Sequence, residues 1–348
     1  MNKDHRSPAT AVVLVSGGLD SILAAKLLQR QNIRVLPLNY TTDYFISQRL
    51  REEGAEKMKQ GEPDRLMLME KEIGVPVRRD DISDAYLSIL IAPPHGFGKG
   101  INPCIDCKIF MLKKATLYME ETGADFIATG EVVGQRPMSQ FMKTLKRIEE
   151  KSGLQGKLLR PLSAKLLPET IPEQTGLVER EKLLDIQGRS RKVQMALARE
   201  WGITAYGQPA GGCYLTDATY ARRFRDLLLH EGRDAITREA MILLQVGRHF
   251  RLREGVKQII GRDKWENHFL ERNMEGRWTM WVKDYPGPLS LTDGRPGKDD
   301  IPVMAALTAA FSDGKREAEV TVVCKTEESE EVCTVKPATK DMIKEYMI

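Results

Sequence analysis

The stretch AVVLVSGGLDS, residues 11–21, decides the fold of the first half of this 348-residue chain. Ala11–Val15 is a short, continuous apolar run, which is typical of a strand buried on both faces of a parallel sheet. The run stops at Ser16-Gly17-Gly18, and apolar residues then recur at helical spacing from Leu19 to Arg30. A buried strand that turns through two glycines into a helix predicts a strand–helix unit with a ligand-binding turn.

This glycine turn is suited to an anion. Two glycines allow the backbone to approach a ligand closely, and the first N–H groups of the helix present its positive dipole end. Ser16 and Ser21 add hydroxyl groups, whereas Asp20 fits an anion site only when a divalent cation accompanies the phosphates. The turn has neither the spacing of a Walker A loop nor that of a dinucleotide fingerprint. The alternative is an ordinary helix N-cap.

Strands and helices alternate after this turn. The pattern predicts strands at 33–38, 75–77 and 125–128, and helices at 46–73 and 105–121. Alternation of this kind predicts an α/β fold with a doubly wound, mostly parallel sheet.

The length of the chain predicts two or three domains. We expect the sheet domain at 1–175, a helical extension at 176–246 and a smaller α+β accessory domain at 247–348. Further helices are expected at 179–184, 190–201, 218–230 and 237–244, with a loop at 207–212 and strands at 278–282, 319–324 and 332–335. The last two strands flank an acidic turn and are typical of a hairpin.

Composition excludes several classes of protein. Hydrophobic residues make up 41% of the chain, which excludes wholesale disorder, and no apolar run approaches the roughly 20 residues of a membrane helix. Five cysteines in such a chain form no disulfide framework, and the polar N-terminus is no secretory signal, so we expect reducing cytoplasm. The net charge is only +4, but residues 141–165 hold seven Lys or Arg against two Glu. Such a run suits a phosphate backbone, or equally a solvated helix face.

Three cysteines lie in or beside loops. Cys104 and Cys107 begin a helix within NPCIDCK, and Cys213 follows two glycines. A helix start favours the thiolate, because the dipole lowers the thiol pKa. Core cysteines, a dithiol pair and part of a zinc site are alternatives, although structural zinc prefers four ligands. Three thiolates suit a [4Fe–4S] cluster with one open iron. Cys324 and Cys333 are expected to be structural.

SGGLDS resembles the PP-loop signature of the ATP pyrophosphatases, the adenine nucleotide α-hydrolase-like fold, which split ATP between its α and β phosphates and adenylylate an oxygen. This resemblance implies that the pyrophosphate and Mg²⁺ are held by Ser16, Gly17, Gly18, Asp20 and Ser21. The same ATP site is expected to include Asn39, Thr129, Gly130 and Arg136. Arg136 follows the strand end at Thr129-Gly130, where a doubly wound sheet places its ligand crevice.

Longer runs are similar to the PP-loop tRNA thiolases, namely the 2-thiouridylases and 4-thiouridine synthetases. They are NPCIDCK (102–108), GADFIATGEVVGQRPMSQ (123–140) and PAGGCYLTD (209–217). The resemblance implies catalytic roles for Cys107 and Cys213, and cluster ligation by these two with Cys104. A persulfide mechanism without Cys104 is the alternative. Glu131 stands where 2-thiouridylases carry His, which leaves the modified uridine position open.

We therefore expect a tRNA sulfurtransferase that converts ATP to AMP and pyrophosphate, with Cys107, Cys213 and Asp20 as catalytic residues. Its expected partners are tRNA and a sulfur donor, either sulfide or a persulfide carrier; a homodimer is compatible with the sequence and no membrane is involved. RNA phosphate contacts are expected at 188–192 and 222–225. The last hundred residues more weakly resemble the RNA-binding module of ribosome quality-control factors. The rivals are a PP-loop amide- or nitrile-forming nucleobase enzyme and a cluster-bearing, nucleotide-sensing RNA-binding protein.

Overall fold

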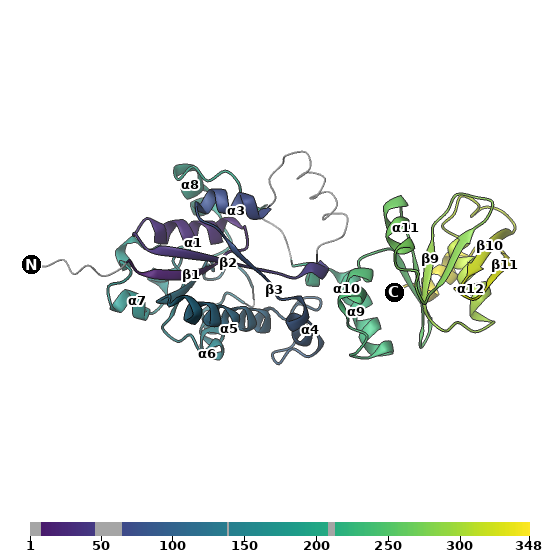
Figure 1. The fold of residues 1–348 in the computed structure, drawn as a ribbon, viewed down its shortest axis with the longest axis horizontal. Coiled ribbons are helices and arrows are strands. Elements are labelled where there is room, and N and C mark those ends of the chain that lie inside the picture. Colours follow the sequence, from purple (N-terminus) through teal and green to yellow (C-terminus); the bar gives the residue numbers. More distant parts are fainter. Residues whose placement is uncertain (1–7, 46–64, 138, 208–212) are drawn as a thin grey trace, which may run out of the picture. The chain divides into compact units, whose positions relative to one another are not determined.

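A computed structural model describes residues 8–45, 65–137, 139–207 and 213–348 of the chain (Figure 1). The chain divides into two compact units, Met1–Cys213 and Tyr214–Ile348, and each is described by itself. The three domains expected from the sequence, with boundaries near 175 and 246, stay a prediction. Within the described ranges, no helix has the length and apolar character needed to cross a membrane.

The first unit is built on a parallel sheet of five strands in the order β3-β2-β1-β4-β5. The strands are β1 (Thr10–Leu14), β2 (Arg34–Thr41), β3 (Arg78–Asp81), β4 (Phe126–Thr129) and β5 (Leu158–Leu159). The chain runs outward from β1 to β3 and then returns to β4 on the other side of β1, so the strand order reverses between β1 and β4. A reversal of this kind is where open α/β sheets bind ligands. The predicted doubly wound sheet is confirmed.

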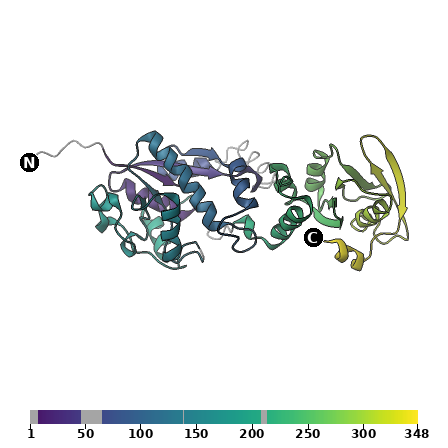
Figure 2. The same cartoon turned by 90° about the horizontal axis from the view of Figure 1, so that it is seen from below.

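Helices cover both faces of this sheet (Figures 1 and 2). One face carries α1 (Leu19–Gln29), α3 (Arg65–Ile73) and α8 (Lys192–Glu200), and the other carries α5 (Cys104–Thr122) and α6 (Met142–Ser152). Alternate residues of β1 enter the two cores: Val13 packs with the α1 layer and Val12 with the α5 layer. Burial on both sides is therefore the reason that β1 is apolar from Ala11 to Leu14.

Short elements complete the first unit. They are η1 (Asp43–Phe45), α4 (Ser83–Ile91), η2 (Ala164–Leu166), α7 (Ile171–Gln174) and η3 (Arg180–Lys182). The helix predicted at 179–184 is wrong, because the structure has only the single turn η3. Val178 and Leu183 are both buried in the core, and a spacing of five residues does not place two side chains on one helix face.

Other boundaries differ by a few residues. The third strand begins at Arg78, beyond the predicted 75–77, and α4 and α6 were not predicted. Within the long predicted helix at 46–73, α3 is the described part. Residues 46–64, and 208–212 of the predicted loop, lie outside the described residues.

The second unit contains an antiparallel sheet of six strands in the order β11-β10-β8-β9-β7-β6. The strands are β6 (Arg248–Arg253), β7 (Val256–Ile260), β8 (Trp278–Val282), β9 (Ser290–Gly294), β10 (Val320–Lys325) and β11 (Glu330–Val335). The helical elements are η4 (Tyr214–Thr216), α9 (Ala218–Glu231), α10 (Arg238–Leu243), α11 (Lys264–Glu271), α12 (Asp300–Ala309) and α13 (Lys340–Tyr346). The predicted hairpin is confirmed as β10–β11.

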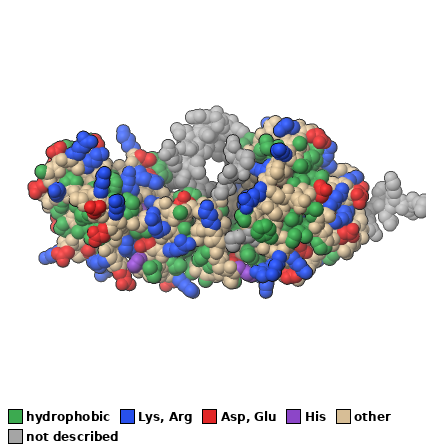
Figure 3. All heavy atoms as spheres, turned by 180° about the vertical axis from the view of Figure 1, so that it is seen from behind, with side chains coloured by type: hydrophobic (Ala, Val, Ile, Leu, Met, Phe, Trp, Pro, Cys, Tyr) green, Lys and Arg blue, Asp and Glu red, His purple; other side chains and the backbone are tan. Residues whose placement is uncertain are grey.

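The core of this second unit lies between α12 and the sheet, and Cys324 is fully buried in it. The smaller α+β accessory part predicted from the sequence is thus confirmed. On the face shown in Figure 3, Lys and Arg side chains of both units are interspersed with Asp and Glu.

Candidate functional site

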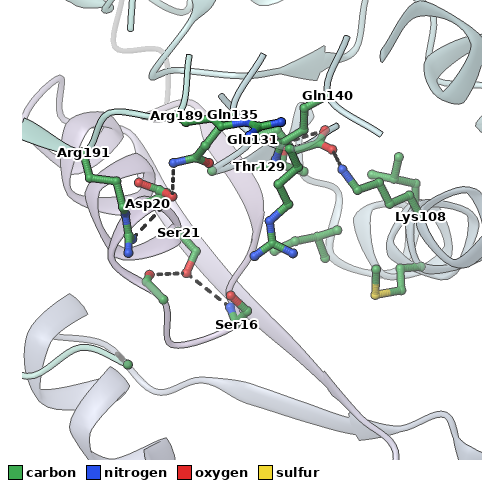
Figure 4. A pocket seen from close by; sticks show the side chains of 17 residues that line it. Ser16, Asp20, Ser21, Lys108, Thr129, Glu131, Gln135, Gln140, Arg189 and Arg191 are labelled. Atoms are coloured by element: carbon green, nitrogen blue, oxygen red, sulfur yellow. Dashed lines mark hydrogen bonds and ion pairs between the residues drawn. The ribbon is translucent and has the colours of Figure 1, made fainter. Parts of the chain in front are cut away.

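A cavity of about 640 Å³ lies in the first unit at the carboxyl ends of β1 and β4. This is where the strand order reverses, and the volume falls in the range of roughly 300–1,000 Å³ that is usual for small-molecule sites. Most of the residues predicted to hold ATP line it, namely Ser16, Gly18, Asp20, Ser21, Thr129, Gly130 and Arg136. Figure 4 shows the cavity from close by.

The glycine turn is fixed by its own hydrogen bonds. Gly17 has a φ of 72°, a left-handed conformation that favours glycine, and its carbonyl accepts the Gly207 N–H at 2.8 Å. The Ser21 hydroxyl donates to the Gly18 carbonyl at 2.8 Å and accepts the Ser16 N–H at 3.2 Å. Ser21 therefore holds the turn in place at the start of α1.

Two of the residues predicted to bind ATP support the cavity without being part of its lining. Gly17 shapes the turn as described above. The Asn39 side-chain amide donates to the Val15 carbonyl at 2.6 Å, so it secures the end of β1 to its neighbour β2.

Gly130 lies directly against the glycine turn. A Cβ added to Gly130 would stand 2.5 Å from the Asp20 carbonyl carbon and 2.6 Å from the Ser21 nitrogen. Only a residue without a side chain allows β4 to end so close to the start of α1. The close approach brings Thr129 and Gly130 into the same cavity as the turn.

Asp20 is the acidic group of the turn. Its Oδ2 accepts a hydrogen bond from Gln135 Nε2 at 3.1 Å and lies 3.6 Å from Arg191 Nη2 (Figure 4). Its Oδ1 is buried and has no hydrogen-bond partner among the described residues. A buried carboxylate oxygen without a donor fits a hard divalent cation such as Mg²⁺, which prefers oxygen ligands. The site thus fits magnesium.

Positive side chains surround the turn. Arg136, Arg189 and Arg191 line the cavity, although the sequence had suggested RNA phosphate contacts for the stretch that holds the last two. Three guanidinium groups and a helix N-terminus around one space make an anion site suited to a polyphosphate.

Lys108 and Glu131 also line the cavity, although neither was predicted to belong to the site. They form an ion pair, and Arg160 Nε lies 3.1 Å from Glu131 Oε2. Burial alone would raise the pKa of the Glu131 carboxyl, but Lys108 and Arg160 lower it to about 2. Glu131 is therefore ionised at neutral pH and holds Lys108 at the cavity wall. The sequence feature that could have indicated Lys108 as a site residue is its position directly after Cys107 at the start of a helix.

The cysteine pair lies in the first turn of α5. Cys104 and Cys107 are partly buried, Cys213 is exposed, and the cavity lining includes none of the three. The preceding loop is hydrogen-bonded to this turn. The Asp106 carboxylate accepts one bond from the His95 backbone N–H at 2.9 Å and one from the His95 ring Nδ1 at 2.6 Å.

The prediction that the helix start favours thiolate is wrong for Cys107. Burial raises the pKa of the Cys107 thiol to about 12, and the nearby Cys104 and Cys213 raise it further by like-charge repulsion. The Tyr86 hydroxyl donates a hydrogen bond to Cys107, and this bond and the charge of Lys108 oppose the rise. Desolvation disfavours any charged form, and here it outweighs the Tyr86 hydrogen bond and the Lys108 charge.

These electrostatic effects bear on the cluster. Since Cys104 and Cys213 both act on Cys107, the three thiols lie within electrostatic reach of one another. Their donor set fits a [4Fe–4S] cluster. In the described part of the chain, no group of three or more His, Cys, Asp or Glu side chains could hold a metal ion. The cysteines therefore match the cluster in chemistry and proximity but are not already arranged as a metal site.

Two family models match the chain. One, described as the tRNA methyl transferase HUP domain, covers residues 9–182, and the other, the NFACT protein RNA binding domain, covers residues 247–347. No curated protein matches the sequence.

Several solved structures are similar. A complex of a 4-thiouridine synthetase with RNA and bound ATP is 19% identical over 66% of this chain and 53% of its own, with a TM-score of 0.37. The predicted tRNA methyltransferase subunit of Methanocaldococcus jannaschii is 15% identical over 55% of this chain and 76% of its own, with a TM-score of 0.33. The C-terminal part of the fibronectin/fibrinogen-binding protein of Streptococcus suis is 16% identical over 70% and 94%, with a TM-score of 0.27. The chain thus spans about half the length of the 4-thiouridine synthetase chain.

Proposed function

The chain belongs to the tRNA methyl transferase HUP domain family, whose model covers half of it, and on this premise we propose that it is an ATP-dependent tRNA sulfurtransferase. The observation that carries the proposal is the cavity at the β1–β4 switch point. There a glycine turn, an unpartnered Asp20 oxygen and three arginines converge. The family's description names methyl transfer, but these lining residues suit a metal-bound polyphosphate, which favours activation by ATP.

The chain's own groups would bind the phosphates. The N-terminus of α1 presents N–H groups and a positive dipole end to them. Arg136, Arg189 and Arg191, which line the same cavity, would neutralise further phosphate charge. Asp20 would hold Mg²⁺ through its buried, unpartnered Oδ1, and the ion would supply positive charge to the phosphates.

The proposed activation step is the adenylylation of a uridine oxygen. A uridine carbonyl oxygen attacks the α-phosphorus of ATP, the bond to the bridging oxygen breaks, and pyrophosphate leaves with the electron pair. Positive charge fixed around the turn stabilises the leaving group as its charge develops. A sulfur nucleophile then attacks the activated carbon and AMP leaves with the original oxygen, so one sulfur replaces one oxygen.

The cysteines would deliver the sulfur. When bound by Cys104, Cys107 and Cys213, a [4Fe–4S] cluster would supply a site for the incoming sulfide. Cys107 must first lose its proton, because its thiol has a pKa of about 12. The Tyr86 hydrogen bond and the Lys108 charge lower this pKa and so favour the thiolate. Lys108 follows Cys107 directly in α5 and also lines the cavity proposed for ATP, so its side chain would serve both the sulfur and the phosphate chemistry.

The tRNA would be held electrostatically near the cavity. Helix α6 begins two residues after the cavity-lining Gln140. It exposes four basic side chains, Lys143, Lys146, Arg147 and Lys151. Lysine and arginine rows of this kind contact phosphates, and the match of residues 247–347 to an RNA-binding domain supports the same partner.

The experiment follows both products. The full chain, purified without oxygen, is given tRNA, ATP and sulfide, and pyrophosphate and thiolated nucleosides are measured. Asp20→Asn is expected to slow pyrophosphate release about 100- to 1,000-fold, since the carboxylate that would hold Mg²⁺ at the phosphates is removed. Cys107→Ala is expected to release pyrophosphate but to form no thiolated nucleoside. Cys333→Ala, on β11 of the second unit, is the matched control and should resemble the unmodified protein.

Other outcomes would contradict the proposal. Pyrophosphate release that requires ammonia and ignores sulfide would indicate an amide- or nitrile-forming enzyme. Binding of ATP and tRNA without any pyrophosphate release would indicate a nucleotide-sensing RNA-binding protein.

A further inference from the structure

A second cavity, of about 210 Å³, lies wholly within the second unit. It is bounded by helices α9 and α10 and by the strands β6, β7 and β9. Apolar side chains form much of its wall, namely Leu227, Ala235, Ala240, Leu243, Leu244 and Ile259. Its volume is below the roughly 300 Å³ at which sites for drug-sized ligands begin, so its occupant is a small group.

Lys257 is an unusual member of this lining. The residue is only 2% exposed, and among the described residues the only ionic partner of its ammonium group is Asp226 Oδ2 at 3.9 Å. The ammonium group makes no hydrogen bond with any described residue. It carries three donors, and the distance of 3.9 Å to Asp226 Oδ2 is too long for a hydrogen bond. Burial lowers the pKa of Lys257 to about 8.

The acids around the cavity are already paired. Arg251 forms ion pairs with Asp226, where Nη2 lies 2.7 Å from Oδ2, and with Glu231 at 2.6 Å. Arg277 forms ion pairs with Asp293 at 2.6 Å and with Glu239 at 2.9 Å. The Lys257 donors therefore remain available to a ligand inside the cavity.

His249 supplies an acceptor beside these donors. It is 1% exposed, and its ring Nε2 lies 2.8 Å from the Val246 carbonyl, to which it donates. Its other ring nitrogen, Nδ1, is buried without a partner among the described residues. Since burial keeps the ring neutral by lowering its pKa, Nδ1 is an acceptor.

We propose that this cavity binds one unstacked nucleobase of an RNA. A flat ring suits the apolar wall, and the edge of a base offers both acceptors for Lys257 and a donor for His249. A phosphate is disfavoured, because Glu231, Glu239 and Asp293 line the same space. The inference rests on the proposed function only in taking RNA as the partner, and it adds that the second unit selects RNA with an unpaired nucleotide.

The test compares two hairpin RNAs, one with a single unpaired 3′ nucleotide and one with an abasic unit at that place. Both carry the same phosphates, so their affinities differ only through the base. The full chain is expected to bind the complete RNA about tenfold more tightly, the order of magnitude of one base contact.

Two variants locate the effect. Lys257→Met removes the donors at similar side-chain length, and Ala240→Phe fills the cavity without changing a charge. Each is expected to bind the complete RNA as weakly as the unmodified chain binds the abasic RNA. Lys315→Met, which changes an exposed lysine of the same unit, is the control and should keep the tenfold difference.

Equal affinity of the unmodified chain for both RNAs would overturn the proposal, as would a tenfold difference that both variants retain. Free adenosine and uridine form a separate arm. If the chain bound a free nucleoside, Ala240→Phe abolished that binding, and the two RNAs bound equally well, the cavity would be a nucleoside site. That result would overturn the proposal that the base comes from an RNA. Pyrophosphate release is assayed apart, so a failure of the proposed reaction leaves this binding result readable.

Discussion

The missing side chain of Gly130 lets β4 end against the glycine turn, and Gly130→Ala tests whether that close approach serves the proposed reaction. The added Cβ would meet Asp20 and Ser21 atoms at 2.5–2.6 Å, whereas ordinary contact begins at 3.4 Å. The turn must therefore move by about 0.9 Å. These neighbours are backbone atoms of the first turn of α1, so no side-chain rotation relieves the overlap.

A displacement on the order of 1 Å at a reacting centre costs about 100-fold in rate, and overpacking destabilises a fold by about 1–3 kcal/mol. We expect kcat/KM for tRNA-dependent pyrophosphate release to fall about 100-fold, with a lower Tm. The matched control is Gly297→Ala, whose added Cβ would find its nearest atom at 3.6 Å. If Gly130→Ala released pyrophosphate at the unmodified rate, the cavity at this strand end would not be the reaction site.

Three further predictions follow from the charges. Glu131→Gln should lower the free energy of unfolding, measured by denaturant titration, by about 3 kcal/mol. This is the low end for a broken buried ion pair, because Arg160 retains its second ion pair, with Glu149. Because the fold lowers the pKa of Glu131, its contribution is present above pH 4.5 and is lost as pH falls toward about 2, and the difference between the two proteins should shrink over that window. Cys107 should react with iodoacetamide at pH 8 far more slowly than the exposed Cys213, and mass spectrometry of peptides that shows equal rates would contradict its raised pKa. The third prediction concerns exposed basic residues of α6, namely Lys143, Lys146 and Arg147. Reversing their charge should lower the slope of log affinity for tRNA against log salt concentration by about 0.9 for each phosphate that the variant no longer neutralises. An unchanged slope would mean that α6 does not contact the RNA.

Local sequence determined much of the first unit. The apolar run from Ala11, the two glycines and the helical spacing from Leu19 are each short-range signals, and β1 and α1 lie within about two residues of their predicted limits. The hairpin β10–β11 was predicted for the same reason, since its strands are neighbours in the chain.

Tertiary structure alone decided which groups share the cavity. Lys108, Glu131 and Arg191 come from distant segments, and they meet because β4 pairs with β1 and the chain closes over the strand ends. Strand order is a property of long-range packing that no local period encodes. The Cys107 thiol makes the same point, because its pKa is raised by burial in the folded chain and lowered by a hydrogen bond from Tyr86, which comes from another helix. A helix start in the sequence indicates a dipole, but only the folded core determines how much water is removed from the sulfur.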